Sequence, residues 1–92
     1  MKMNKERFHN ELAMRLGYER IVKDKRITIA VDDSDDPWVT LKFEGSSEVV
    51  RFKASDKVDS ALAERIPAMQ EEINSIVGSV HQAFVDASSS RF

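Results

Sequence analysis

Residues 38–53, WVTLKFEGSSEVVRFK, decide the fold because apolar and polar side chains alternate on both sides of a short turn. Alternate side chains of a strand point to opposite faces of a sheet, so the stretch predicts two strands with one apolar and one polar face. The turn 44–47 is short, and short turns join antiparallel neighbours. The apolar face consists of Val39, Leu41, Phe43, Val50 and Phe52.

A further strand precedes this hairpin. Ile27, Ile29 and Val31 alternate with Thr28 and Ala30, and the segment that follows is an acidic turn. The pattern predicts a three-stranded antiparallel meander over residues 26–53. Residues 21–22 either extend the first strand or form a short piece before it.

Helices are predicted before and after the strands in the sequence. Residues 4–16 carry Phe8, Leu12 and Leu16 at four-residue spacing, and Asn4 can cap the helix. Residues 56–86 are predicted to be helical with a break near Pro67, because proline interrupts a helix but suits its first turn. The serine-rich tail, residues 87–92, is predicted to fray.

The C-terminal segment has an apolar seam with spacings of three and four residues. It is formed by Leu62, Ile66, Met69, Ile73, Ile76, Val80 and Ala83. The seam can lie across the apolar face of the sheet, or pair with a second copy and make a homodimer. With either packing, residues 1–92 form a single α+β domain of two layers.

Composition narrows the classes of protein further. The chain has 92 residues and no cysteine, which excludes disulfides and zinc–thiolate sites. No apolar run is long enough to span a membrane, so a cytoplasmic protein is expected. Residues 1–31 contain eight basic and four acidic residues, a net charge of +4, whereas residues 32–92 contain six and twelve, a net charge of −6. Such polarity favours oriented docking on a charged partner.

Two basic groups are candidate binding residues. On the polar face of the hairpin, an aromatic ring lies among cations that suit a phosphate backbone, a stacked base or an acidic protein patch. This group contains Trp38, Thr40, Lys42, Arg51 and Lys53. The second group, Arg20, Lys23, Lys25 and Arg26, leads into the first strand and can contact phosphates or remain solvated. The two groups make one surface if the first strand lies beside them.

The acidic turn contains Asp32, Asp33, Asp35 and Asp36. As a calcium loop starting at Asp32, it would place Pro37 where glycine is needed and Phe43 where a bidentate glutamate is needed, so an EF-hand is excluded. The remaining interpretations are a solvated turn and a contact to arginines that normally hold phosphate.

Catalytic motifs are missing from the sequence. It has no G-x-S-x-G nucleophile elbow and no phosphate-binding glycine loop, and His9 and His81 have no partner at metal-ligand spacing. We therefore expect a non-enzymatic binding protein without a cofactor or a metal.

In size, charge polarity and helix–three strands–helix order, the chain resembles the small phage-encoded anti-CRISPR proteins. The resemblance implies a cytoplasmic inhibitor that docks on a nucleoprotein complex, such as a type I CRISPR surveillance complex of Cas proteins and guide RNA, and blocks nucleic-acid access. There are two alternatives. One is a small nucleic-acid-binding protein, similar to nucleoid-associated proteins, that dimerises through the 62–83 seam. The other is a secretion or assembly chaperone.

Overall fold

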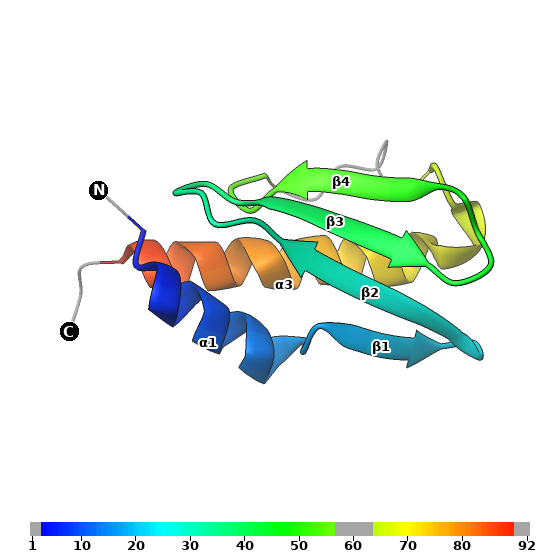
Figure 1. The fold of residues 1–92 in the computed structure, drawn as a ribbon, viewed down its shortest axis with the longest axis horizontal. Helices are drawn as coiled ribbons and strands as arrows, with labels where there is room; N and C mark the ends of the chain where they lie inside the picture. The colour runs from blue at the N-terminus through cyan, green and yellow to red at the C-terminus, as the bar shows by residue number, and fades with distance from the viewer. Residues whose placement is uncertain (1–2, 57–63, 90–92) are drawn as a thin grey trace.

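The computed structural model describes residues 3–56 and 64–89, which form an α+β domain of two layers (Figure 1). One layer is an antiparallel sheet and the other contains two helices. The elements are α1 (Lys5–Arg15), β1 (Glu19–Val22), β2 (Lys25–Val31), β3 (Trp38–Phe43), β4 (Val49–Lys53), the 3-10 turn η1 (Pro67–Met69) and α3 (Gln70–Ser88).

The sheet is a meander in the order β1-β2-β3-β4, so it has one strand more than the three predicted. The additional strand is β1, which pairs antiparallel with β2. Lys23 and Asp24 connect the two strands with φ angles of 52° and 64°. Left-handed residues give a two-residue turn the twist that a hairpin needs, but the Lys-Asp pair lacks the glycine that most clearly marks such a turn in a sequence.

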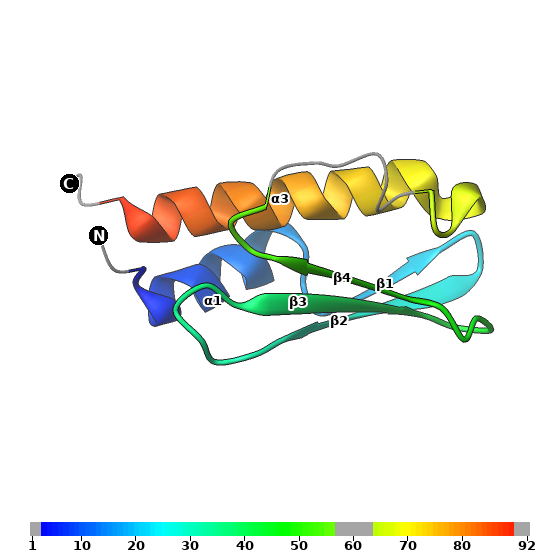
Figure 2. The same cartoon turned by 90° about the horizontal axis from the view of Figure 1, so that it is seen from above.

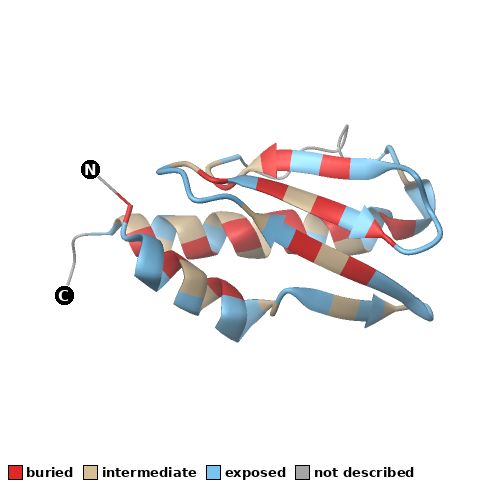
Figure 3. Ribbon diagram, in the orientation of Figure 1, coloured by how far each residue is buried: buried red, intermediate tan, exposed pale blue. Residues whose placement is uncertain are grey.

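The apolar face of the sheet faces the core, as the alternation predicts. Ile27, Val39, Leu41 and Val50 are completely buried, and Figure 3 shows buried positions alternating with exposed ones along β3 and β4. Both helices lie on this side of the sheet (Figure 2).

The C-terminal helix begins where proline predicts a break. Pro67 opens η1, and α3 then runs to Ser88. Ile73, Ile76, Val80 and Ala83 of the seam are buried within the single chain. This burial agrees with the first of the two predicted packings, in which the seam lies against the chain's own sheet; the homodimer stays a prediction. Leu62 and the first part of the helical segment predicted from residue 56 lie outside the described residues.

The two ends of the described chain meet. The side chain of Asn4 caps α1 by accepting a hydrogen bond from the backbone N–H of Arg7 at 3.0 Å, as predicted. The backbone N–H of Asn4 donates to the carbonyl of Ala87 at 2.9 Å, and Ala87 is only 3% exposed. This contact and burial keep α3 ordered past the end predicted for it at residue 86.

Candidate functional site

The outer face of the sheet, on the side away from the helices, carries the predicted aromatic and basic side chains. The strand register places Trp38 opposite Lys53, and Thr40 opposite Arg51. Lys42 lies opposite Thr28 on one side and Val49 on the other. We call Trp38, Thr40, Lys42, Arg51 and Lys53 the outer-face cluster.

Trp38 and its neighbours make the closest contacts within this cluster. The guanidinium carbon of Arg51 lies 4.4 Å from the centroid of the indole ring, and the Lys53 ammonium lies 5.3 Å from it. Both distances are within the range of a cation–π interaction. Trp38 remains 37% exposed, so it contacts the two cations while part of the residue still reaches solvent.

The second basic group does not form one surface with this cluster, because alternation along β1 and β2 separates its members. Arg26 lies on the outer face, where Glu19 is 3.7 Å from its guanidinium. Arg20 is opposite the buried Ile27 and therefore lies on the helix side of the sheet. The Lys23 ammonium donates to the carbonyl of Ala68 at 3.0 Å, and Lys25 begins β2 opposite Val22. Of the second basic group, only Arg26 lies on the same face of the sheet as the outer-face cluster.

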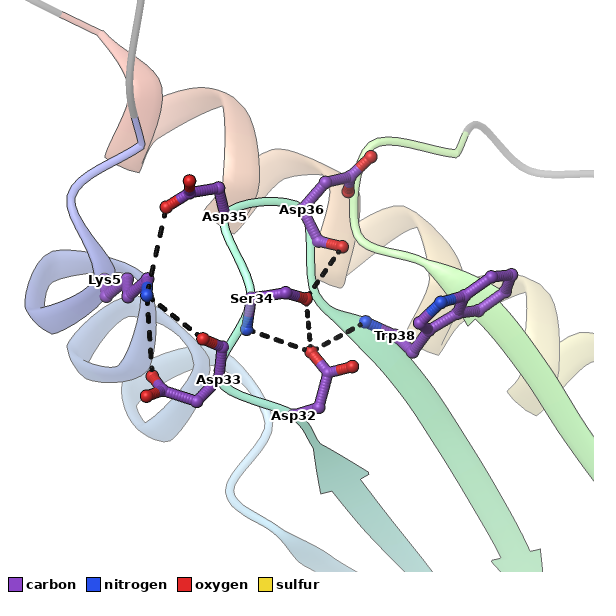
Figure 4. Close-up of polar contacts among 7 residues, drawn as sticks. All are labelled: Lys5, Asp32, Asp33, Ser34, Asp35, Asp36 and Trp38. Carbon is purple, nitrogen blue, oxygen red and sulfur yellow. Dashed lines mark hydrogen bonds and ion pairs between the residues drawn. The ribbon is translucent and has the colours of Figure 1, made fainter.

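The Asp32 carboxylate holds the acidic turn together (Figure 4), and the Asp36 carboxylate ties the turn to the segment after β4. Asp32 accepts hydrogen bonds from the backbone N–H groups of Ser34 and Trp38, each at 3.2 Å, and from the Ser34 hydroxyl. Asp36 accepts from the Ser55 hydroxyl at 2.6 Å and from the Ser55 N–H at 3.1 Å. Asp32 and Asp36 thus have hydrogen-bond partners within the chain, while the role predicted for the four aspartates in binding a partner stays a prediction.

The hydrogen bonds of Asp32 also change its titration. The bond from the Ser34 hydroxyl is the main reason that the pKa of Asp32 lies below its ordinary value, with the Ser34 and Trp38 N–H groups and the charge of Arg51 adding to the effect. All of these favour the charged carboxylate.

The other two aspartates face solvent. The side chains of Asp33 and Asp35 are 90% and 60% exposed, and each lies just under 4 Å from the Lys5 ammonium, at 3.9 Å and 3.8 Å. Lys5 also donates to the carbonyl of Asp33 at 3.0 Å, and Figure 4 shows the lysine reaching the turn from α1. Asp33 and Asp35 are therefore open to contact by a partner.

Three residues near the site were not predicted from the sequence. Glu19 and the exposed Ile21 lie on the outer face, because β1 belongs to the sheet. The alternation of these two residues with Arg20 and Val22 was the available signal. Lys5 meets the acidic turn from 28 positions away, which no local pattern indicates.

The described residues contain no metal-ligand cluster and no membrane-spanning helix. Within residues 3–56 and 64–89, no three His, Asp or Glu side chains gather as metal ligands. No helix in that part of the chain is long and apolar enough to cross a membrane. Comparison with family models, with curated proteins and with solved structures found no match to this chain.

Proposed function

We propose that this chain is a non-enzymatic inhibitor that docks through the outer face of its sheet on a nucleoprotein complex, such as a CRISPR surveillance complex, and blocks nucleic-acid access. The observation that carries the proposal is the stacking of Arg51 on Trp38 beside Lys53, on the face of the sheet away from its buried side chains. An arginine that is already stacked loses little freedom when its N–H groups bind an anion.

The charges of the outer-face cluster are open to a partner. In the described part of the chain, Lys42, Arg51 and Lys53 form no ion pair, and Lys42 and Arg51 are exposed. Aromatic and arginine side chains are the residues that most often dominate binding energy in interfaces. Their position on a regular sheet also fixes their geometry better than a loop would.

The exposed carboxylates of Asp33 and Asp35 place negative charge close to the positively charged outer face. The acidic turn joins β2 to β3 next to Trp38 (Figure 4). A surface that is basic on the sheet and acidic at one end can orient the protein on a complex that displays both nucleic acid and basic protein side chains. A CRISPR surveillance complex, which holds RNA in a basic channel, has this chemistry.

The proposal is tested by binding to a purified type I surveillance complex with its guide RNA. The variant combines Lys42→Glu, Arg51→Glu and Lys53→Glu, and a matched control combines Arg7→Glu, Lys25→Glu and Arg65→Glu at exposed positions away from the cluster. We expect the cluster variant to lose at least about 100-fold in affinity, about 2.7 kcal/mol, and to stop blocking target DNA. The control should retain most of the binding.

Equal losses of affinity in the two variants would show that only the overall charge matters. Such a result would contradict docking through the outer face of the sheet. Failure of the unmodified chain to bind any such complex would refute the proposed function. The dimeric nucleic-acid-binding alternative has no observation in its favour, because the seam it needs is buried within one chain. The chaperone alternative stays a prediction that capture of a client protein would test.

A further inference from the structure

We infer that the cations of the outer face contact the phosphates of one single nucleic-acid strand, lying obliquely across β4, β3 and β2. The inference rests on the proposed function and names the part of the complex that this face touches. It follows from the order of the cations in the strand register, together with their shared sign.

The cations occupy successive rows of the sheet, one in each row. Lys53 lies in the row of Trp38, Arg51 in the row of Thr40, and Lys42 in the row of Thr28. Arg26 lies in the next row, opposite Ile21. Rows on one face are about 6.7 Å apart along the strands, and neighbouring strands are about 4.8 Å apart. The four residues therefore form a continuous stripe, which we call the cation stripe, with Lys53 and Arg51 on β4, Lys42 on β3 and Arg26 on β2.

A row of cations with one charge in each row of the sheet matches a row of anions that repeats along a chain. A nucleic-acid strand carries one phosphate on each nucleotide, whereas the carboxylates of an acidic protein patch follow no such repeat. Thr40 and Thr28 lie next to the stripe in the rows of Arg51 and Lys42. Hydroxyl donors of this kind commonly contact phosphate oxygens beside arginine and lysine.

The width of the sheet favours a single strand over a duplex. Four strands at about 4.8 Å spacing span about 14 Å between the outer two. The major groove of B-DNA is about 12 Å wide and admits a helix or a two-stranded ribbon. An open four-stranded face instead accommodates one strand whose bases spread over it. Trp38 lies at the Lys53 end of the stripe with Arg51 over its ring, and the 37% of the residue that stays exposed can contact a base.

The stripe is weakest at Arg26. The carboxylate of Glu19 lies 3.7 Å from the Arg26 guanidinium and competes with a phosphate for it, although both side chains are more than half exposed. We therefore expect three full phosphate contacts, from Lys42, Arg51 and Lys53, and a partial one from Arg26.

The test measures the anisotropy of labelled single-stranded RNA and DNA of about 12 nucleotides, and of the matching duplex, with the full chain. Three contacts on a single strand predict that log K falls with log salt with a slope of about −2.1, so affinity drops about 20-fold between about 50 and about 200 mM salt. The single strands should bind more tightly than the duplex.

Single substitutions then identify the contacts. Lys42→Gln, Arg51→Gln and Lys53→Gln should each make the salt slope shallower by about 0.7. Glu19→Gln should make it steeper by up to about 0.7, because it frees Arg26 for a fourth contact. The exposed Arg7→Gln, on α1, should leave the slope unchanged. Circular dichroism checks that every variant is folded.

The inference would be overturned if the duplex bound more tightly than the single strands. It would also be overturned if the salt slope did not change with the substitutions in the cation stripe. If single strands fail to bind while the charge-reversed cluster still abolishes docking on the surveillance complex, the face contacts protein; the inference then fails and the proposed function stands. If single strands bind with the expected slope but the complex does not bind, the proposed function fails and the cation stripe stands.

Discussion

Arg51 on β4 stacks over Trp38 on β3, with 4.4 Å between the guanidinium carbon and the ring centroid. The two residues are diagonal neighbours, since Trp38 is directly opposite Lys53. Diagonal positions on one sheet face lie within reach of aromatic and long side chains. The contact therefore depends on the register between two strands.

The stack gives a direct spectroscopic prediction. Trp38 is the only tryptophan in the chain, so its fluorescence reports on this face alone. Arg51→Ala should shift the emission to longer wavelength, because the ring loses its cover and meets more water. Arg7→Ala on α1 should leave the spectrum unchanged. An Arg51→Ala spectrum identical to that of the unmodified chain would show that the stack is not formed in solution.

Asp36 and Asp35 are adjacent in the acidic turn but should differ in their effect on stability. Asp36→Ala removes two charge-assisted hydrogen bonds to Ser55 and should lower the free energy of unfolding by about 1.5–3 kcal/mol. Asp35→Ala removes only an exposed contact with Lys5 and should change it by less than about 0.5 kcal/mol. Urea unfolding of both variants measures the difference. Similar values for the two would contradict the assignment of a structural role to Asp36.

Asp32 should make stability depend on acid pH. Its pKa in the folded chain is lowered, chiefly by the hydrogen bond from the Ser34 hydroxyl. A lowered pKa means that the unfolded chain takes up the proton first, so the stabilisation is present above the ordinary pKa of aspartate and is lost as the pH falls through the folded value.

The melting temperature of the unmodified chain should therefore fall more steeply in this acid range than that of Asp32→Ala, which lacks the titrating group. Asp33→Ala, which lies in the same turn and loses only a solvent-exposed contact with Lys5, serves as the control. Parallel pH curves for the unmodified chain and Asp32→Ala would count against the role given to these hydrogen bonds.

The turn between β1 and β2 offers a stabilising substitution. Asp24 has a φ angle of 64°, a conformation that glycine adopts without the steric cost of a side chain. Asp24→Gly should raise the free energy of unfolding by about 0.5–1 kcal/mol, as measured by urea denaturation. Lys23 is kept in this variant because its ammonium contacts the Ala68 carbonyl. A loss of stability would show that the Asp24 side chain has a stabilising role of its own.

The buried seam predicts how unfolding depends on concentration. Ile76 is 1% exposed within one chain, so Ile76→Ala should lower the free energy of unfolding by about 2–5 kcal/mol. The unfolding midpoints of the unmodified chain and of the variant should not change with protein concentration. A midpoint that rises with concentration would indicate that a second copy stabilises the fold, as the homodimer interpretation requires.

The candidate site was only partly predictable from sequence. Trp38, Lys42 and Arg51 were placed correctly on the outer face because period-two alternation is a local property of a strand. The basic residues 20–26 were grouped by proximity in sequence, yet pairing of β1 with β2 sends Arg20 and Arg26 to opposite faces. The different uses of Asp32 and Asp33 depend on which donors the turn brings near, and similar side chains in one short turn give no sign of this.

By itself, the sequence determined the α+β class, the β2–β4 strands, the apolar face of the sheet and the start of the C-terminal helix near Pro67. These features follow from spacing and backbone constraints over a few residues. Tertiary structure alone decided that β1 joins the sheet, that the seam is covered within one chain, and that four cations align across three strands. Each of these depends on register and packing between segments distant in sequence, which local periodicity does not encode.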